Sequence, residues 1–215
     1  MSCMSQNKTL LRVDSSPFPG EMSFSRQLTS EFVARWRNMQ PNGCIIERDL
    51  AKTALEPLQA PWIAAAYTPE ASRTPEQSAL LKTSDELIAE LQAADEYVFG
   101  VSMHNFSIPS SLKLWIDQVA RVGKTFSYEG GTPAGLLKGK KATFLVATGG
   151  VYEQGTPMAA LNHIEPYLRS VFGFLGVKDV TFINASGTSR ARAGVAPATI
   201  LRPALDSIRA QFQAA

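Results

Sequence analysis

The chain has 215 residues, of which 45% are hydrophobic and 19% charged, a composition typical of a soluble globular protein. The net charge is only +2 and the basic residues are scattered, so nothing indicates a nucleic-acid partner. The sequence shows neither the roughly 20-residue apolar run of a membrane span nor the apolar segment of a signal peptide. We therefore expect one domain over residues 1–215.

The two cysteines and two histidines further limit the kinds of site that the chain can form. Cys3 lies near the terminus, and Cys44 stands in an apolar run that predicts a core position. They form no metal-binding spacing, and two histidines are too few for a histidine-based metal centre. This usage favours a reducing cytoplasm.

Strands and helices are predicted to alternate along the chain. The five strands are predicted at 9–13, 44–48, 96–101, 141–147 and 178–183. The helices between and after them are predicted at 23–40, from 75 to about 91, and at about 109–121, 158–174 and 197–213. Two further segments are an excursion at 51–74, with a short helix near 62–66, and a glycine-rich segment at 123–138. Five strands that alternate with helices predict an α/β fold whose parallel sheet carries helices on both faces.

Ligands of open α/β sheets bind beyond the carboxyl ends of the strands, which selects three loops. The first, 15–25, opens a helix and offers the hydroxyls of Ser16, Ser23 and Ser25 to an anion at the helix N-terminus. It is neither a GxGxxG nor a Walker A loop, and a phosphate held without Lys or Arg suits FMN better than ATP. The alternative is a plain serine N-cap at Ser23 or Ser25.

The second loop displays Met103, His104, Asn105 and Phe106 after a buried strand. The Asn105 amide carries a donor and an acceptor, as the edge of a planar heterocycle requires, and its neighbours are flat or soft groups that can line a ring. The alternative is an ordinary turn with Asn105 in a left-handed conformation and Phe106 in the core.

The third loop contains Ala147, Thr148, Gly149 and Gly150, and its paired glycines allow close approach of a ligand to the backbone. A tight turn is the alternative. The coincidence of three such loops at one edge of the sheet favours a flavin site. We interpret the segment 186–192, after the last strand, as a surface turn; a place near the site is its alternative.

The stretch MHNFSIPSSLK at 103–113, continued by Trp115-Ile116-Asp117, Val119-Ala120-Arg121, Thr125-Phe126 and Tyr128, resembles the FMN-dependent NAD(P)H azoreductases. This family is also described as NAD(P)H:quinone oxidoreductases. The early Ser23-Phe24-Ser25 and the late Gly149-Gly150 complete the resemblance. It implies a flavodoxin-like three-layer sandwich with strand order 2-1-3-4-5.

The resemblance also implies roles for particular residues. Ser16 and Ser23-Phe24-Ser25 would bind the FMN phosphate. Met103-His104-Asn105-Phe106 would run beside the isoalloxazine and ribityl chain, and Ala147-Thr148-Gly149-Gly150 would contact the pyrimidine side of the ring. A homodimer with active sites at its interface is implied, in which Tyr128 reaches over the partner's flavin.

The implied activity passes two electrons from NADH or NADPH through FMN to quinones and azo compounds, by a ping-pong mechanism and without a nucleophilic side chain. The chain departs from the family at His104, at Ala147-Thr148 and at Tyr152. Tyr152 and His104 either line the substrate site or donate a hydrogen bond there. Two other functions stay open: a flavodoxin-like electron carrier or redox sensor, and a serine hydrolase using Ser102.

Overall fold

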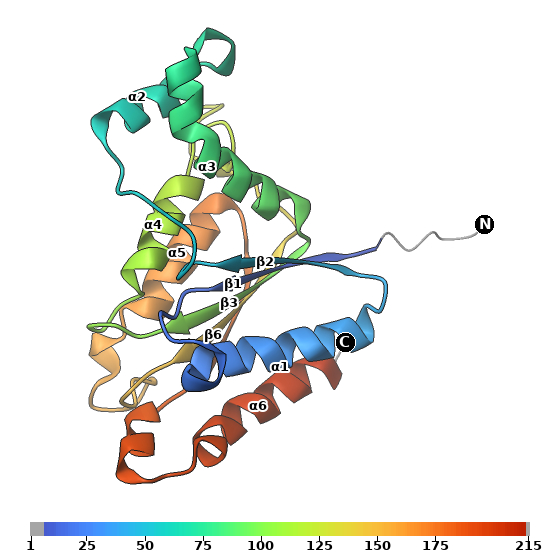
Figure 1. Ribbon diagram of the computed structural model, residues 1–215, viewed down its shortest axis with the longest axis vertical. Helices are drawn as coiled ribbons and strands as arrows, with labels where there is room; N and C mark the ends of the chain where they lie inside the picture. The colour runs from blue at the N-terminus through green and yellow to red at the C-terminus, as the bar shows by residue number, and fades with distance from the viewer. Residues whose placement is uncertain (1–6, 214–215) are drawn as a thin grey trace, which may run out of the picture.

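A computed structural model describes residues 7–213 and contains a five-stranded parallel sheet. Its strands are β1 (Thr9–Asp14), β2 (Cys44–Asp49), β3 (Glu96–Ser102), β6 (Lys141–Ala147) and β7 (Asp179–Ala185), in the order β2-β1-β3-β6-β7. This is the expected order 2-1-3-4-5 when the main-sheet strands are counted along the chain. Helices α1 (Phe24–Met39) and α6 (Pro197–Gln213) cover one face, and α3 (Pro75–Ala93), α4 (Ser110–Val119) and α5 (Ile164–Leu175) cover the other (Figure 1).

Successive residues of the central strands enter two different cores, because side chains alternate between the faces of a sheet. Phe99 and Phe144 stack with ring centroids 4.9 Å apart beneath α4 and α5. Val98 and Leu145, one position away, are fully buried against α1 and α6. Burial on both faces explains why these strands are almost continuously apolar.

The excursion between β2 and α3 contains the predicted short helix, which is α2 (Ala60–Tyr67). Ala65 and Ala66 of this helix pack with Leu81 of α3 in a small separate cluster. Thr74 and Gln77 then form a reciprocal capping box that fixes the start of α3. The part of the excursion that contains α2 is therefore packed onto α3, at a distance from the sheet (Figure 1).

Residues 123–138, which we call the strap, contain a short hairpin of β4 (Phe126–Ser127) and β5 (Ala134–Gly135). The strap is fixed to the end of α5 by a hydrogen bond of 2.9 Å from the Leu137 N–H to the Leu175 carbonyl oxygen. A Cβ atom added at Gly135 would lie 2.1 Å from the Gly176 nitrogen. Glycine at 135 is therefore required by a close backbone crossing.

Two predictions about local structure are wrong. The helix expected from about residue 158 begins only at Ile164, because the Asn162 side chain accepts the backbone N–H groups of residues 164 and 165 after a 3-10 turn at Ala159–Leu161. Cys44 is exposed, because it begins β2, which pairs only with β1 and forms an edge of the sheet. Cys3 lies outside the described residues.

Among residues 7–213, no helix combines the length and apolar character that a bilayer crossing demands.

Candidate functional site

A cavity of about 510 Å³ lies at the carboxyl edge of the sheet, where the loops after β1, β3, β6 and β7 meet. Its position is the one expected for the ligand site of an open α/β sheet. Its lining residues are Ser16, Phe18, Met22, Ser23, Phe24, Ser25, Ser102, Met103, His104, Ala147, Gly149, Thr188, Ser189, Ala191 and Arg192.

The loop after β1 contributes three buried serine hydroxyls, as predicted. Ser16 Oγ accepts a hydrogen bond of 3.3 Å from the Phe18 N–H, and among the described residues its own O–H has no acceptor. Ser23 Oγ lies 3.2 Å from Ser25 Oγ and also caps α1 by accepting the Arg26 N–H. The same hydroxyls line a cavity at a helix N-terminus, so Ser23 can cap α1 and still take part in an anion site.

Arg26 lies behind this loop and fixes its shape. One terminal nitrogen donates to the Ser16 carbonyl oxygen at 2.7 Å and to Asp49 Oδ1 at 2.6 Å, and the other donates to Asp49 Oδ2 at 3.1 Å. Arg26 is 9% exposed and does not line the cavity. The Ser16 carbonyl is therefore bound on the side away from the cavity, which orients the loop between β1 and α1.

The loop after β3 is a two-residue turn with paired hydrogen bonds of 2.9 and 3.0 Å between the backbones of His104 and Ser107. Asn105 and Phe106 have φ angles of 48° and 69°, as a type I′ turn requires at both central positions. They form the tip and do not line the cavity, unlike Met103 and His104. The left-handed Asn105 of the alternative is confirmed, but Phe106 is 42% exposed and not in the core.

Variants of Asn105 separate the role of its side chain from that of its backbone. Asn105→Gly retains the positive φ without strain, so we expect an unchanged free energy of unfolding and weaker FMN binding if the amide contacts the flavin. Asn105→Ala adds a left-handed alanine, which costs about 1 kcal/mol. Thermal unfolding of the apoprotein and a fluorescence titration with FMN measure the two effects. Unchanged FMN affinity in the glycine variant would remove Asn105 from the proposed site.

The cavity contains a serine–histidine contact, because Ser102 Oγ lies 3.2 Å from His104 Nε2. A hydrolase also needs a group that orients the histidine and a nucleophile on a tight strand-to-helix turn. Within residues 7–213 no carboxylate lines the cavity, and α4 starts only at Ser110, after the turn. This arrangement gives no support to the hydrolase alternative.

The loop after β6 is joined to the segment that follows β7. Gly149 lines the cavity, and a Cβ atom at this position would have no neighbour within 4 Å, so the backbone there borders open space. Its carbonyl oxygen accepts Ser189 Oγ at 2.7 Å, and the Thr148 carbonyl oxygen accepts the Thr188 N–H at 2.9 Å. Thr148 and Gly150 do not line the cavity, and Thr148 Oγ1 donates to the Gly150 carbonyl oxygen at 2.8 Å.

The 3-10 helix η4 (Thr188–Ala193) is the part of the site that the sequence analysis missed. The prediction of a surface turn at 186–192 is wrong and its alternative, a place near the site, is confirmed. Four residues of the segment line the cavity, namely Thr188, Ser189, Ala191 and Arg192. The position of this segment could have indicated a place in the site, because it also follows the carboxyl end of a parallel strand.

Neither predicted tyrosine lines the cavity. Tyr152 lies next to it, with its ring 6.3 Å from the Phe106 ring in an edge-to-face arrangement. Tyr128 is on the strap, 54% exposed, with its ring against Phe126. In the isolated chain Tyr128 therefore has no contact with the site.

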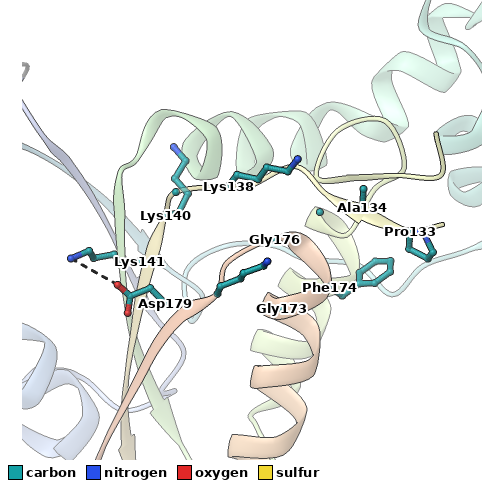
Figure 2. A pocket seen from close by; sticks show the side chains of 12 residues that line it. Pro133, Ala134, Lys138, Lys140, Lys141, Gly173, Phe174, Gly176 and Asp179 are labelled. Carbon is teal, nitrogen blue, oxygen red and sulfur yellow. Dashed lines mark ion pairs between the residues drawn. The ribbon is translucent and has the colours of Figure 1, made fainter. Parts of the chain in front are cut away.

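A larger cavity, of about 660 Å³, lies at the amino ends of β6 and β7, next to the strap (Figure 2). Four lysines line it, and Figure 2 shows Lys141 directed toward its ion-pair partner Asp179. Lys140 donates to the carbonyl oxygen of Gln92 at 2.8 Å. This end of the sheet holds none of the predicted site residues and receives the C-terminus of α5, whose dipole favours nearby cations.

The strand order and the cavity between the loops after β1, β3 and β6 define a protein of the flavodoxin-like class. A family model described as "Flavodoxin-like fold" matches residues 8–210, and the chain belongs to this family.

Three similar proteins cover almost the whole chain. An FMN-dependent NADH:quinone oxidoreductase of Acidobacterium capsulatum is 54% identical over 94% of this chain and 97% of its own length. FMN-dependent NADH:quinone oxidoreductase 3 of Burkholderia lata is 43% identical over 94% of this chain and 98% of its own. The crystal structure of an azoreductase from Bacillus anthracis has a TM-score of 0.85 and 28% identity, and covers 95% of this chain and 98% of that one.

Proposed function

We propose that this protein is an FMN-dependent oxidoreductase that passes two electrons from NADH to quinones, and to azo compounds, by alternate binding of donor and acceptor. The observation that carries the proposal is the serine-lined cavity at the carboxyl edge of a flavodoxin-like sheet. The names of relatives at 54% and 43% identity support NADH as donor and quinones as acceptors. We take residues 1–215 as one FMN-binding domain.

The residues of the cavity fit FMN. A volume of about 510 Å³ lies within the roughly 300–1,000 Å³ of small-molecule sites. Buried hydroxyls at the start of α1 suit a phosphate, and the open space beside Gly149 leaves room for a ring close to the backbone. Apolar side chains that also line the cavity suit the flat faces of a flavin. They are Phe18, Met22, Phe24, Met103 and Ala147.

We assign the binding and orientation of FMN to the chain's own residues as follows. Ser16, Ser23 and Ser25 hold the phosphate, with Phe24 in the same segment. Met103 and His104 run beside the ring and ribityl chain, continued by Asn105 and Phe106 at the tip of the turn. The segment Ala147-Thr148-Gly149-Gly150 borders the pyrimidine side. When bound, FMN supplies the two-electron chemistry, so no side chain has to act as a nucleophile.

The visible spectrum and steady-state kinetics of the purified protein test this function. We expect a yellow protein, or one that becomes yellow on addition of FMN, and NADH oxidation that depends on an added quinone. Parallel lines in double-reciprocal plots would indicate alternate binding. A protein that binds FMN but does not turn over NADH and quinone would be an electron carrier, and one that takes up no FMN would contradict the proposal altogether.

We also propose a homodimer, supported by exposed apolar side chains next to the site, on the strap and at the end of α5. Phe106, Tyr128, Leu136, Val151 and Phe174 are each at least 40% exposed, and such side chains frequently mark interfaces. Tyr128 would then act on the partner's site. Sedimentation velocity of the FMN-loaded protein tests the dimer, which a monomer at micromolar concentration would contradict. The exposed thiol of Cys44 suits a reducing compartment, which supports a cytoplasmic location.

A further inference from the structure

The charge of the cavity is set by one residue. Within the part of the chain that the structure describes, Arg192 is the only Lys, Arg, Asp or Glu that lines the cavity. Among the described residues, the Arg192 side chain takes part in no ion pair or hydrogen bond. A guanidinium ion that has no protein partner and borders a cavity rich in hydroxyls is complementary to an anion.

The segment that carries Arg192 is held firmly in place. The N–H groups of Gly187 and Thr188 donate to the Gly150 and Thr148 carbonyl oxygens at 2.9 Å each. Ser189 donates to Gly149 through both its N–H and its hydroxyl. Gly194, with a φ of 86°, ends η4 in the left-handed conformation. The Arg192 backbone is therefore pre-organised at the cavity, and only the exposed side chain has to be ordered when a ligand binds.

The path of the chain brings η4 toward the serine loop. η4 leads directly into α6, which packs along α1 on the same face of the sheet. Leu201 and Leu205 of α6 share a groove with Gly20 and Glu21, which lie just before Ser23. Arg192 thus approaches the cavity from the side on which α1 begins, where Phe18 and Met22 line it.

We propose that the guanidinium group of Arg192 binds the phosphate of FMN across the cavity from Ser16, Ser23 and Ser25. This inference rests on the proposed function. It changes one expectation from the sequence, in which the phosphate is held by hydroxyls and backbone N–H groups alone. A dianionic phosphate gains a charge-assisted hydrogen bond, which is about twice as strong as a neutral one.

The comparison of FMN with riboflavin isolates the phosphate, because the two flavins differ only there. We expect Arg192→Gln to raise the Kd of FMN about tenfold and to leave the Kd of riboflavin unchanged. Arg192→Lys should recover part of the FMN affinity, because it keeps the charge but not the forked geometry. Arg202→Gln is the matched control, since Arg202 is an exposed arginine of α6 that does not line the cavity. Flavin fluorescence quenching measures each Kd in low and high salt.

Three results would overturn the inference. Equal weakening of FMN and riboflavin would mean that Arg192 shapes the cavity rather than binds phosphate. Unchanged flavin affinities with a raised KM for a carboxylate-bearing azobenzene, but not for neutral benzoquinone, would assign the guanidinium to the acceptor. If Arg192→Gln bound FMN as tightly as wild type and still oxidised NADH with quinone, the role of Arg192 would be rejected but the proposed function would stand. A wild-type protein that binds neither flavin would reject the proposed function itself.

Discussion

Arg26→Ala is expected to lower the free energy of unfolding by about 3 kcal/mol and to weaken FMN binding at least tenfold. The substitution leaves Asp49 without its two-pronged partner and the buried Ser16 carbonyl oxygen without a donor. Removing one member of such a pair costs about 3–5 kcal/mol when both are buried, and the lower end applies because the Asp49 side chain is 26% exposed. Denaturant unfolding of the apoprotein and FMN titration measure the two losses.

Arg26→Lys controls for charge, because a single ammonium group cannot bind the Ser16 carbonyl and both Asp49 oxygens in the same geometry. We expect partial recovery of stability and weaker recovery of FMN affinity. Asp49→Asn should lose stability but retain the bond to Ser16, and with it most of the FMN affinity. If Arg26→Ala bound FMN as wild type does, the residue would have no part in orienting the serine loop.

The stability difference between wild type and Arg26→Ala is expected to depend on pH. Burial raises the pKa of Asp49, but the hydrogen bonds from Arg26 and the Ala51 N–H more than offset this, so the pKa lies below its ordinary value. The stabilisation is complete above the carboxyl pKa of the unfolded chain, about 3.9, and is lost as the pH falls through the lower folded pKa. Urea unfolding at pH 7 and below pH 4 should show the difference shrinking in acid.

Gly135→Ala is the second substitution with a large expected effect, a loss of about 3 kcal/mol in the free energy of unfolding. The added Cβ would lie 2.1 to 2.4 Å from backbone atoms of Leu175 and Gly176, which no side-chain rotation can relieve. Gly173→Ala is the control in the same region, since its Cβ would meet nothing within 4 Å. In the interior of α5 alanine should stabilise by up to about 1 kcal/mol.

The same variant separates the strap from the flavin site. No strap residue lines the cavity at the carboxyl edge, so FMN affinity at a temperature where Gly135→Ala is folded should match that of wild type. The proposed dimer should weaken and the KM for quinone should rise, because the strap carries Tyr128, which we propose to act on the partner's site. If Gly135→Ala unfolded at the same denaturant midpoint as wild type, α5 and the strap would be able to separate with little loss of free energy, which would contradict this prediction.

The sheet and most helices could be predicted because burial on two faces leaves a clear record in the sequence. Val98 and Phe99 belong to different cores, yet both must be apolar. Features decided by neighbours distant in sequence could not be predicted. Cys44 follows an apolar pattern, but its exposure depends on whether a strand lies beyond β2. Asn162 interrupts a periodic helix through a side-chain bond that competes with helix continuation.

In the candidate site too, residues with a local chemical signature could be predicted, and residues placed by distant parts of the chain could not. Ser16, Ser23 and Ser25 could be found because hydroxyls at a helix start carry a local chemical meaning. Asn105 and Phe106 are expected at the flavin but do not line the cavity, because they form the tip of a turn of two consecutive left-handed residues that no sequence pattern specified. Arg192 was missed because its position depends on hydrogen bonds between η4 and the loop at Thr148 and Gly149.

The walls of the cavity come from residues between Ser16 and Arg192, on loops that follow four different strands. No short fragment of the chain contains the site, so FMN would recognise only the assembled sheet. Binding free energy then adds to global stability by mass action, about 2.7 kcal/mol when free FMN is at 100 times its Kd. The melting temperature should therefore rise with the concentration of free FMN. In a cell short of flavin, the apoprotein would be the form that unfolds and is degraded first.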